Sequence, residues 1–300
     1  MRKLLSILFC LLALSSCIKD DISTCAGMMY FHFSYMYGGT NSFFEMEKAD
    51  LTAHFYKVGN ATKYRELNVN REEISLRQPF SVEKTPEDID SLEFVSWSQD
   101  EQLDYIGTPE TPLGEGYVHL KEISDGSGIC RPVEDLFYGR TKFDAKDRYQ
   151  RNDITVPYVR AVCRIRITMI PRTINRPDGT PVIPEPEDYV FHVMGTRNKI
   201  DDNNITGGEN IILQPECHYD QTSGNVVADW FGAFGSPEGE YLKLHVYIRE
   251  KEVASFDFTY NEIAAVPGHF LDLEIDGRYI NPIMDVYVNG WKTAVIVSNM

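Results

Sequence analysis

The chain has 300 residues, a formal net charge of −16 and a hydrophobic content of 43%. This composition is sufficient for a packed core and excludes a disordered chain. The acidic excess disfavours binding to nucleic acid and to anionic lipid headgroups, so a basic patch is not expected to attach the chain to a membrane.

The amino terminus has the pattern of a secretory signal peptide. A short basic head precedes the apolar run LLSILFCLLAL, which is shorter than the ~20 apolar residues that span a membrane. The following LSSC resembles the bacterial lipobox, in which cleavage precedes the cysteine and its thiol carries a diacylglyceryl group. We therefore expect residues 1–16 to be removed and Cys17 to be lipidated. The alternative is a plain signal peptide with an incidental cysteine.

Residues 17–27 are predicted to form a lipidated tether. The sequence IKDD that follows Cys17 resembles the short acidic export tag that sends lipoproteins of the Bacteroidota to the outer leaflet of the outer membrane. An acidic run after a lipid anchor is also simply a solvated tether. More than one acyl chain gives stable anchoring. The resemblance to the export tag implies that the protein lies at the outer membrane and is exposed at the cell surface.

Alternation with a period of two dominates the remaining sequence. In RAVCRIRITMI, apolar residues such as Cys163, Ile165 and Ile167 alternate with polar ones, which predicts a half-buried antiparallel strand. Turn signals at Asp276-Gly277 and Asn289-Gly290 predict hairpins. Helical windows are limited to 70–76 and 86–91. Further strands are expected at 28–36, 53–58, 92–97, 189–194, 242–249, 252–259 and 283–288. The expected fold class is all-β.

Two domains are expected after the tether. The charged stretch DAKDRYQRND lacks apolar periodicity, as a linker does, and ITVPYVRAVCRIRI has the pattern of the opening strands of a new sandwich. The predicted boundary is near residue 152, which gives β-sandwich domains at 28–152 and 153–300.

Motifs of catalysis are absent from the sequence. The seven histidines are scattered, and there is no GxSxG elbow, P-loop or zinc-type cysteine spacing. We therefore expect no enzyme activity, no cofactor and no metal site. The sequence 201–204 (DDNN) is predicted to be a polar turn rather than a cation site.

The cysteines beyond the tether leave their pairing open. An exported protein can form disulfides, and four cysteines allow three pairings. A buried free thiol is an equal alternative for Cys163, which lies within a predicted strand. The four are Cys25, Cys130, Cys163 and Cys217.

Several segments together resemble one family. After the lipobox come DLFYG at residues 135–139, VPYVRAVCRIRI, HYDQTSGNV, AVPG before LDLEIDG, and a terminal VYVNGWK. Over most of the mature chain this series is similar to the fimbrial anchor lipoproteins of the Bacteroidota, the FimB-like family of minor fimbrial subunits. DLFYG and the terminal VxVxxW are its more specific parts.

The resemblance implies two tandem transthyretin-like antiparallel β-sandwiches and a non-enzymatic role at the base of a surface fibre. It also implies pilin subunits as partners, assembled by a process that resembles donor-strand exchange. The candidate strand is the terminal MDVYVNGWKTAVIVSNM. Its apolar row is Met284, Val286 and Val288, and Trp291 with the following valines is expected to extend that row. The alternative, slightly favoured by the Asn289-Gly290 turn, is that these residues form the chain's own last hairpin.

Two other functional classes remain possible from the sequence. A surface glycan-binding lipoprotein would expose a planar row of aromatic side chains, so the exposure of Trp97 and Trp230 discriminates it. A lipoprotein hydrolase would need a cleft with paired carboxylates or a metal cluster. An anchor needs a strand available for pairing and no such cleft. The identity of the pilin and of any glycan ligand is not encoded in a recognisable motif.

Overall fold

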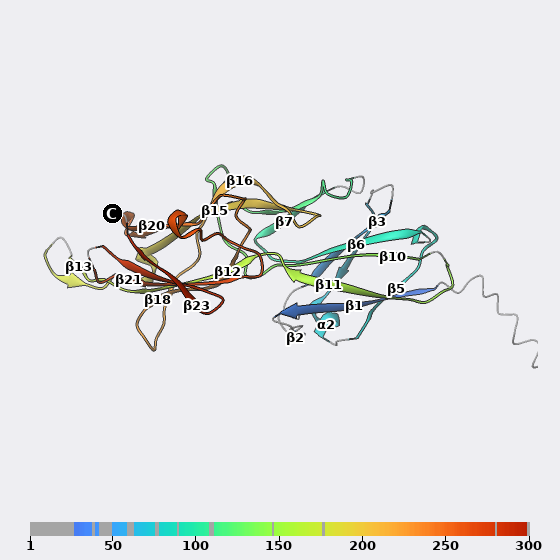
Figure 1. The fold of residues 1–300 in the computed structure, drawn as a ribbon, viewed down its shortest axis with the longest axis horizontal. Helices are drawn as coiled ribbons and strands as arrows, with labels where there is room; N and C mark the ends of the chain where they lie inside the picture. The colour runs from blue at the N-terminus through green and yellow to red at the C-terminus, as the bar shows by residue number, and fades with distance from the viewer. Residues whose placement is uncertain are drawn as a thin grey trace, which may run out of the picture.

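The structure, a computed structural model, describes residues 27–37, 40–41, 50–58, 63–75, 78–88, 90–107, 111–145, 147–175, 178–279 and 281–298. Within these ranges the chain is mostly β, as the alternation predicted, and forms an elongated molecule (Figure 1). The expected signal peptide and Cys17 lie outside the described residues. In the described part, no helix has the length and hydropathy needed to cross a membrane.

The amino-terminal strands form one eight-stranded sheet with its own aromatic core. Phe31 stacks on Phe94 at 4.9 Å between ring centroids and meets Phe55 edge-on at 5.7 Å. All neighbours in this sheet are antiparallel except β1 and β11. The strand order is β2 (Thr40–Asn41), β1 (Met28–Tyr37), β11 (Asn152–Arg160), β10 (Phe137–Asp144), β6 (Ser91–Ser98), β3 (Leu51–Lys57) and β4 (Lys63–Val69), with β5 (Phe80–Glu83) beside β1.

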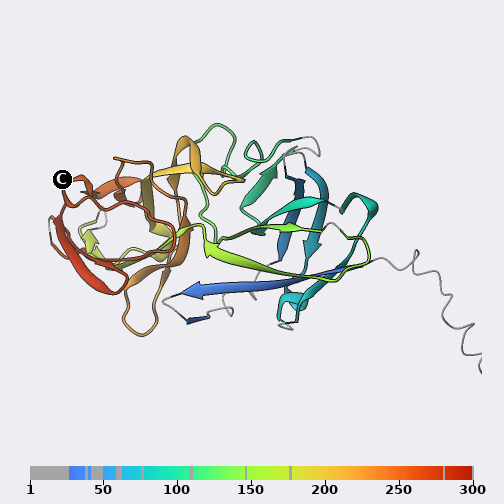
Figure 2. The same cartoon turned by 45° about the vertical axis from the view of Figure 1, so that its right-hand side comes forward.

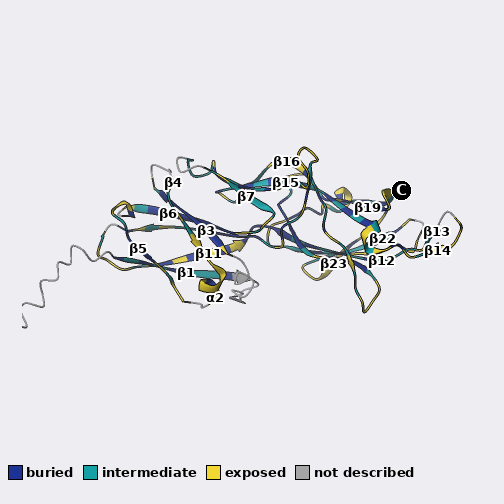
Figure 3. Ribbon diagram, turned by 180° about the vertical axis from the view of Figure 1, so that it is seen from behind, coloured by how far each residue is buried: buried dark blue, intermediate teal, exposed yellow. Residues whose placement is uncertain are grey.

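The carboxy-terminal strands form most of two further sheets, in which many residues are buried (Figure 3). These residues belong to a larger hydrophobic cluster that also includes Tyr56, Trp97 and Tyr138. The six-stranded sheet has the order β17 (His218–Tyr219), β18 (Val226–Ala233), β12 (Cys163–Ile170), β21 (Phe270–Asp276), β22 (Ile283–Val288) and β23 (Trp291–Val297). The seven-stranded sheet has the order β20 (Lys251–Asp257), β19 (Lys243–Ile248), β15 (Tyr189–Asp201), β16 (Thr206–Leu213) and β9 (Ile129–Cys130), with β8 (Tyr117–Leu120) beside β15 and β7 (Leu103–Ile106) beside β8. A separate small ribbon pairs β13 (Ile174–Asn175) with β14 (Pro181–Val182).

Helical structure is as scarce as predicted. The window at 70–76 contains the single described α-helix, α2 (Arg71–Ser75). Asn70 caps it, because its Oδ1 accepts the Glu73 N–H at 2.9 Å and the Glu73 carboxylate accepts the Asn70 N–H at 3.3 Å. The window at 86–91 contains the 3-10 turn η3 (Pro86–Asp88), and two more such turns are η4 (Pro186–Asp188) and η5 (Thr259–Asn261).

The strand pairing ties the two halves of the chain together. Strands β7, β8 and β9 precede residue 152 but join the sheet of β15 and β16. Strand β11 follows the predicted boundary but pairs with β1 and β10. Earlier residues such as Trp97 and Tyr138 already belong to the larger cluster, and the last change from one cluster to the other falls between Tyr158 and Ala161. The predicted boundary near residue 152 therefore lies before this change, and the division into two domains stays a prediction.

A buried carboxylate forms part of the junction between the halves. The turn at 201–204 is the polar turn that was predicted, but it also presents Asp202, which is fully buried, to the amino-terminal sheet. Its Oδ2 accepts the Tyr56 hydroxyl at 3.0 Å and lies 3.5 Å from that of Tyr105, while its main-chain oxygen accepts the Tyr138 hydroxyl at 2.9 Å. Burial raises the pKa of Asp202.

One hairpin prediction was wrong in detail. The described residues after Asp276-Gly277, at 278–279 and 281–282, are not in a strand, and β22 begins only at Ile283. The Arg278 guanidinium turns back to Asp276 at 2.9 Å, and Pro282 has no N–H to donate to a ladder. A longer connection therefore replaces the tight turn that the Asp-Gly pair suggested.

Candidate functional site

The carboxy-terminal hairpin is the first candidate contact surface. Strands β22 and β23 pair in antiparallel fashion around Asn289 and Gly290, whose φ angles of 50° and 83° suit a tight hairpin turn. The hairpin expected as the alternative to a donated strand is therefore present within this chain. Strand β23 ends the order of its sheet, and among the described strands only β22 pairs with it.

The inner face of this hairpin belongs to the chain's own core. Met284 and Val286 are fully buried, and Ala294 and Ile296 continue their row on β23. Val288 is half-buried against the same cluster. The predicted apolar row of β22 thus fills this chain's own sandwich. Because Val286 is paired with Ala294, the following valines of β23 do not extend that row, and this part of the prediction was wrong.

Strand β23 carries exposed apolar residues along its length: Val295 and Val297 lie on its outer side, and a bulge places Trp291 opposite Val288 at the turn. Trp291 is 80% exposed, Val295 is 55% exposed and Val297 is 53% exposed. We call these three residues the β23 apolar surface. An edge strand offers unpaired N–H and C=O groups, and an exposed apolar edge is a pairing site unless charge or cover protects it. Ser298, beyond the strand end, accepts the Ser255 N–H at 3.1 Å, and β20 lies near β23 without pairing with it.

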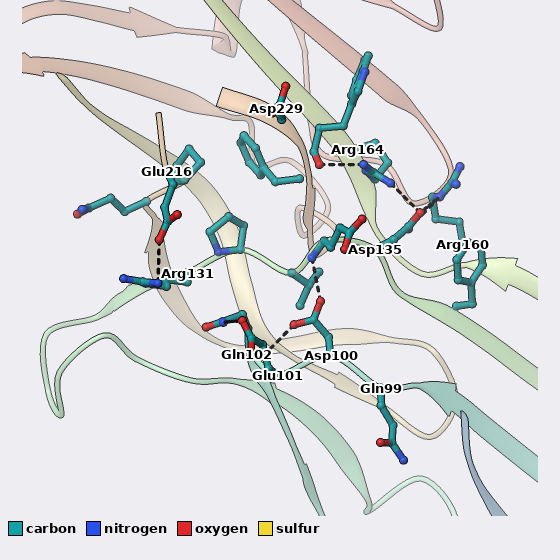
Figure 4. Close-up of a pocket in the computed structure, with 18 of the residues that line it drawn as sticks. Gln99, Asp100, Glu101, Gln102, Arg131, Asp135, Arg160, Arg164, Glu216 and Asp229 are labelled. Carbon is teal, nitrogen blue, oxygen red and sulfur yellow. Dashed lines mark hydrogen bonds and ion pairs between the residues drawn. The ribbon is translucent and has the colours of Figure 1, made fainter. Parts of the chain in front are cut away.

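A large polar cleft between the two halves is the second candidate (Figure 4). Its volume is about 1190 Å³, and its lining mixes carboxylates, guanidinium groups and amides with a few aromatic rings. Many of these polar groups already have partners in the chain. Arg131 pairs with Glu216 at 2.8 Å, and Asp100 accepts the main-chain N–H groups of Gln102 and Glu134 at 2.8 and 2.9 Å.

Asp135 is the centre of the best-ordered contacts in this cleft. Its carboxylate lies 3.0 Å from Arg160 Nε and 2.8 Å from Arg164 Nη1, and Arg164 Nη2 donates to the Trp230 main-chain oxygen at 2.8 Å (Figure 4). Burial raises the pKa of Asp135 to about 6, against the lowering effect of Arg164. Asp135, the first residue of DLFYG, therefore links the segment before β10 to β11 and β12 through ion pairs with Arg160 and Arg164. This role was missed, since sequence alone does not show that the two arginines approach it.

The two tryptophans do not form the exposed aromatic row that a glycan-binding protein would need. Trp97 is 2% exposed and belongs to the core. Trp230 is half-buried, with its ring packed edge-on to Phe270 at 5.4 Å and the Arg166 guanidinium 5.1 Å from its centroid. Neither forms part of a flat exposed aromatic row. Among the described residues, no three His, Cys, Asp or Glu side chains are grouped to hold a metal ion.

The described cysteines are free thiols. Cys130 and Cys163 are buried and Cys217 is half-buried. Burial raises the pKa of Cys130 to about 11 and that of Cys163 and Cys217 to about 12, which disfavours the nucleophilic thiolate form. Cys25 lies outside the described residues.

Comparison with known proteins gives one family. The sequence profile of the family "Fimbrillin-A associated anchor proteins Mfa1 and Mfa2" matches residues 22–297. No protein with a curated description matches the chain in sequence.

Solved structures share the fold at low sequence identity. The fimbrial anchor protein Mfa2 from Porphyromonas gingivalis is 12% identical over 90% of this chain and 99% of its own, with a TM-score of 0.59. A candidate adhesin from Bacteroides ovatus is 16% identical over 94% of this chain and 97% of its own, with a TM-score of 0.63. A candidate polysaccharide-binding protein from Bacteroides thetaiotaomicron is 13% identical over 88% of this chain and 96% of its own, with a TM-score of 0.60.

Proposed function

The chain belongs to the family of fimbrillin-A associated anchor proteins, and from this premise we propose that it holds the base of a fimbria at the outer membrane. The family is one of structural proteins rather than enzymes, and it implies association with fimbrillin subunits and a place at the cell surface. The exposed apolar edge of β23 indicates which surface contacts the fimbria. This edge lies in the half of the molecule away from the start of β1 (Figure 1).

The membrane attachment is a lipid on Cys17. The sequence before Cys17 has the order of a basic head, a short apolar run and a lipobox, and residues 18–27 connect the cysteine to β1. A net charge of −16 disfavours attachment to anionic headgroups, so a lipid is the expected anchor. The body that the lipid carries is the pair of tandem transthyretin-like β-sandwiches expected from the sequence, with the tether at 17–27.

The fimbrillin contact is a strand of the partner added alongside β23. Releasing the hairpin as a donated strand would expose Met284 and Val286, and each buried side chain of this size is worth about 1.5–3 kcal/mol. Adding a strand to the β23 edge costs no such exposure. It also covers Trp291 and Val295, whose exposure is otherwise unfavourable. Main-chain pairing would give affinity, and alternate side chains would give specificity.

Binding of purified fimbrillin to variants of this chain tests the contact. Trp291→Ala removes the largest exposed apolar side chain of β23, and Val295→Glu places a charge at the centre of the strand. An interface tryptophan that carries binding energy typically contributes about 2 kcal/mol or more, and an unpaired charge buried in an interface costs about as much. We therefore expect each variant to bind roughly 30-fold more weakly. Tyr260→Ala is the matched control, because Tyr260 is 95% exposed but lies on η5. Equal affinity of all three variants would exclude the β23 edge as the contact.

A further inference from the structure

Two long parallel strand pairs lie along the axis of a chain whose other ladders are nearly all antiparallel. Seven residues of β1 pair with β11, from Met29 with Asn152 to Tyr35 with Tyr158. Seven residues of β12 pair with β21, beginning with Arg164 opposite Phe270. The only other parallel pair among the described strands, β16 with β9, has two residues on each side.

The two parallel pairs are joined end to end. Strand β11 ends at Arg160 and β12 begins at Cys163, so only Ala161 and Val162 lie between them, and both are fully buried. The stretch from β11 to β12 is therefore one backbone path across the junction between the halves (Figure 2). Strand β1 is attached to the first part of this path and β21 to the second.

We propose that these two pairs form a mechanical clamp that carries tension from the membrane to the fimbria. The inference rests on the proposed function, which places the lipid before β1 and the fimbrial contact on the hairpin that follows β21. Tension then enters β1 at Met28 and is resisted at the other end of β11, where the chain continues into β12. Strands β1 and β11 are parallel, and they are pulled from opposite ends. The force therefore acts along the strands and slides one past the other, which is shear.

This geometry loads all rungs of each ladder together. The hydrogen bonds of a parallel pair are evenly spaced, so under shear they share the force, whereas bonds pulled apart from one end break in turn. The same reasoning applies to the second pair, in which β21 is pulled from Asp276 and β12 is held from Cys163. Antiparallel neighbours such as β5 lie beside β1 and are sheared in the same way.

Side chains reinforce both ladders across the strands. Arg166 and Asp272 are direct register partners and form a two-pronged ion pair, with Nε 3.0 Å from Oδ1. On the first pair, His32 Nε2 lies 3.1 Å from Asp153 Oδ1. On the opposite face of β1, the fully buried Phe31 anchors the strand in the aromatic core.

Single-molecule force measurements on the chain from residue 18 onward test the clamp. In the shear geometry, one handle is attached to the amino terminus and the other to an azido amino acid at Arg278, in the connection after β21. In the unzipping geometry, the second handle is moved to Arg151, directly before β11, so that β1 and β11 are pulled apart from the same end. We expect the unzipping force to be less than about half the shear force, because in the unzipping geometry the hydrogen bonds between the strands break one at a time.

Two further variants locate the resistance within the shear geometry. Asp272→Asn removes the ion pair across β12 and β21, and we expect it to lower the rupture force. Asp285→Asn removes the comparable pair with Lys292, which joins β22 to β23 outside the loaded path, and we expect no change. Equal forces in the two geometries, or equal effects of the two variants, would overturn the clamp. Neither lipid nor fimbrillin is present, so this result is separable from failure of the proposed anchor function.

Discussion

Replacing the buried His54 should remove a defined part of the acid sensitivity of this protein. His54 lies on β3 with no exposed surface, 4.2 Å from the Tyr105 ring centroid and 3.3 Å from Glu66 Oε2. The Nδ1 atom has no hydrogen-bond partner among the residues that the structure describes, and Nε2 is the atom that faces Glu66. Burial, aided by the neighbouring Lys63, lowers the pKa of His54 from 6.5 to about 4.

The sign and size follow from linkage. Between pH 6.5 and about 4 the unfolded chain binds a proton at His54 that the folded chain does not bind, so the free energy of unfolding falls as the pH falls. At about 1.4 kcal/mol per pH unit, this histidine alone accounts for a loss of roughly 2.5 kcal/mol between about pH 7 and about pH 4.5.

Urea unfolding, followed by tryptophan fluorescence at both pH values, measures this loss. His54→Phe keeps an aromatic ring beside Tyr105 and should lose roughly 2.5 kcal/mol less stability than the wild type over this interval. His218→Phe, at a histidine whose side chain is 53% exposed, is the matched control and should retain the wild-type pH dependence. If His54→Phe and the wild type lost the same free energy, the assigned pKa of this buried ring would be refuted.

Further predictions concern the hairpin and the Asp135 contacts. Met284→Ala should lower the free energy of unfolding by about 2–5 kcal/mol, because it leaves a cavity in the core. Thr293→Ala, at an exposed position of β23, should change the free energy of unfolding by less than about 0.5 kcal/mol. Similar values for the two variants would contradict the burial of β22. Asp135→Asn should lower the free energy of unfolding by about 3 kcal/mol at neutral pH, because the guanidinium groups of Arg160 and Arg164 lose their shared carboxylate. An unchanged urea midpoint would show that these ion pairs do not contribute to stability.

Local structure was well encoded in the sequence. The strict alternation of RIRITM gave β12, and the Asn-x-x-Glu spacing at Asn70 and Glu73 accompanies the short helix that the 70–76 window predicted. The turn at Asn289-Gly290 was recognisable because both residues readily adopt a positive φ. These features depend only on neighbours within a few residues in the chain.

The pairing of distant segments could not be predicted in the same way. Alternation in β1 shows that it has a buried face but not that its partner is β11, more than a hundred residues later. For the same reason Asp135 gave no sign of its two arginine partners. Met284 and Val286 were identified as one apolar face, yet only the strand register shows that this face lies in the chain's own core.

Retention of fimbriae on cells that carry Cys17→Ser as their only copy of this chain tests the anchor most directly. The account predicts that fimbriae still assemble but are released into the medium, because the chain at their base has lost its acyl groups. The amounts of fimbrillin on the cells and in the medium are compared with those of the wild type, after exported Cys17→Ser chain has been detected in the cell envelope. Wild-type retention of fimbriae by such cells would contradict the role of this protein as their lipid anchor.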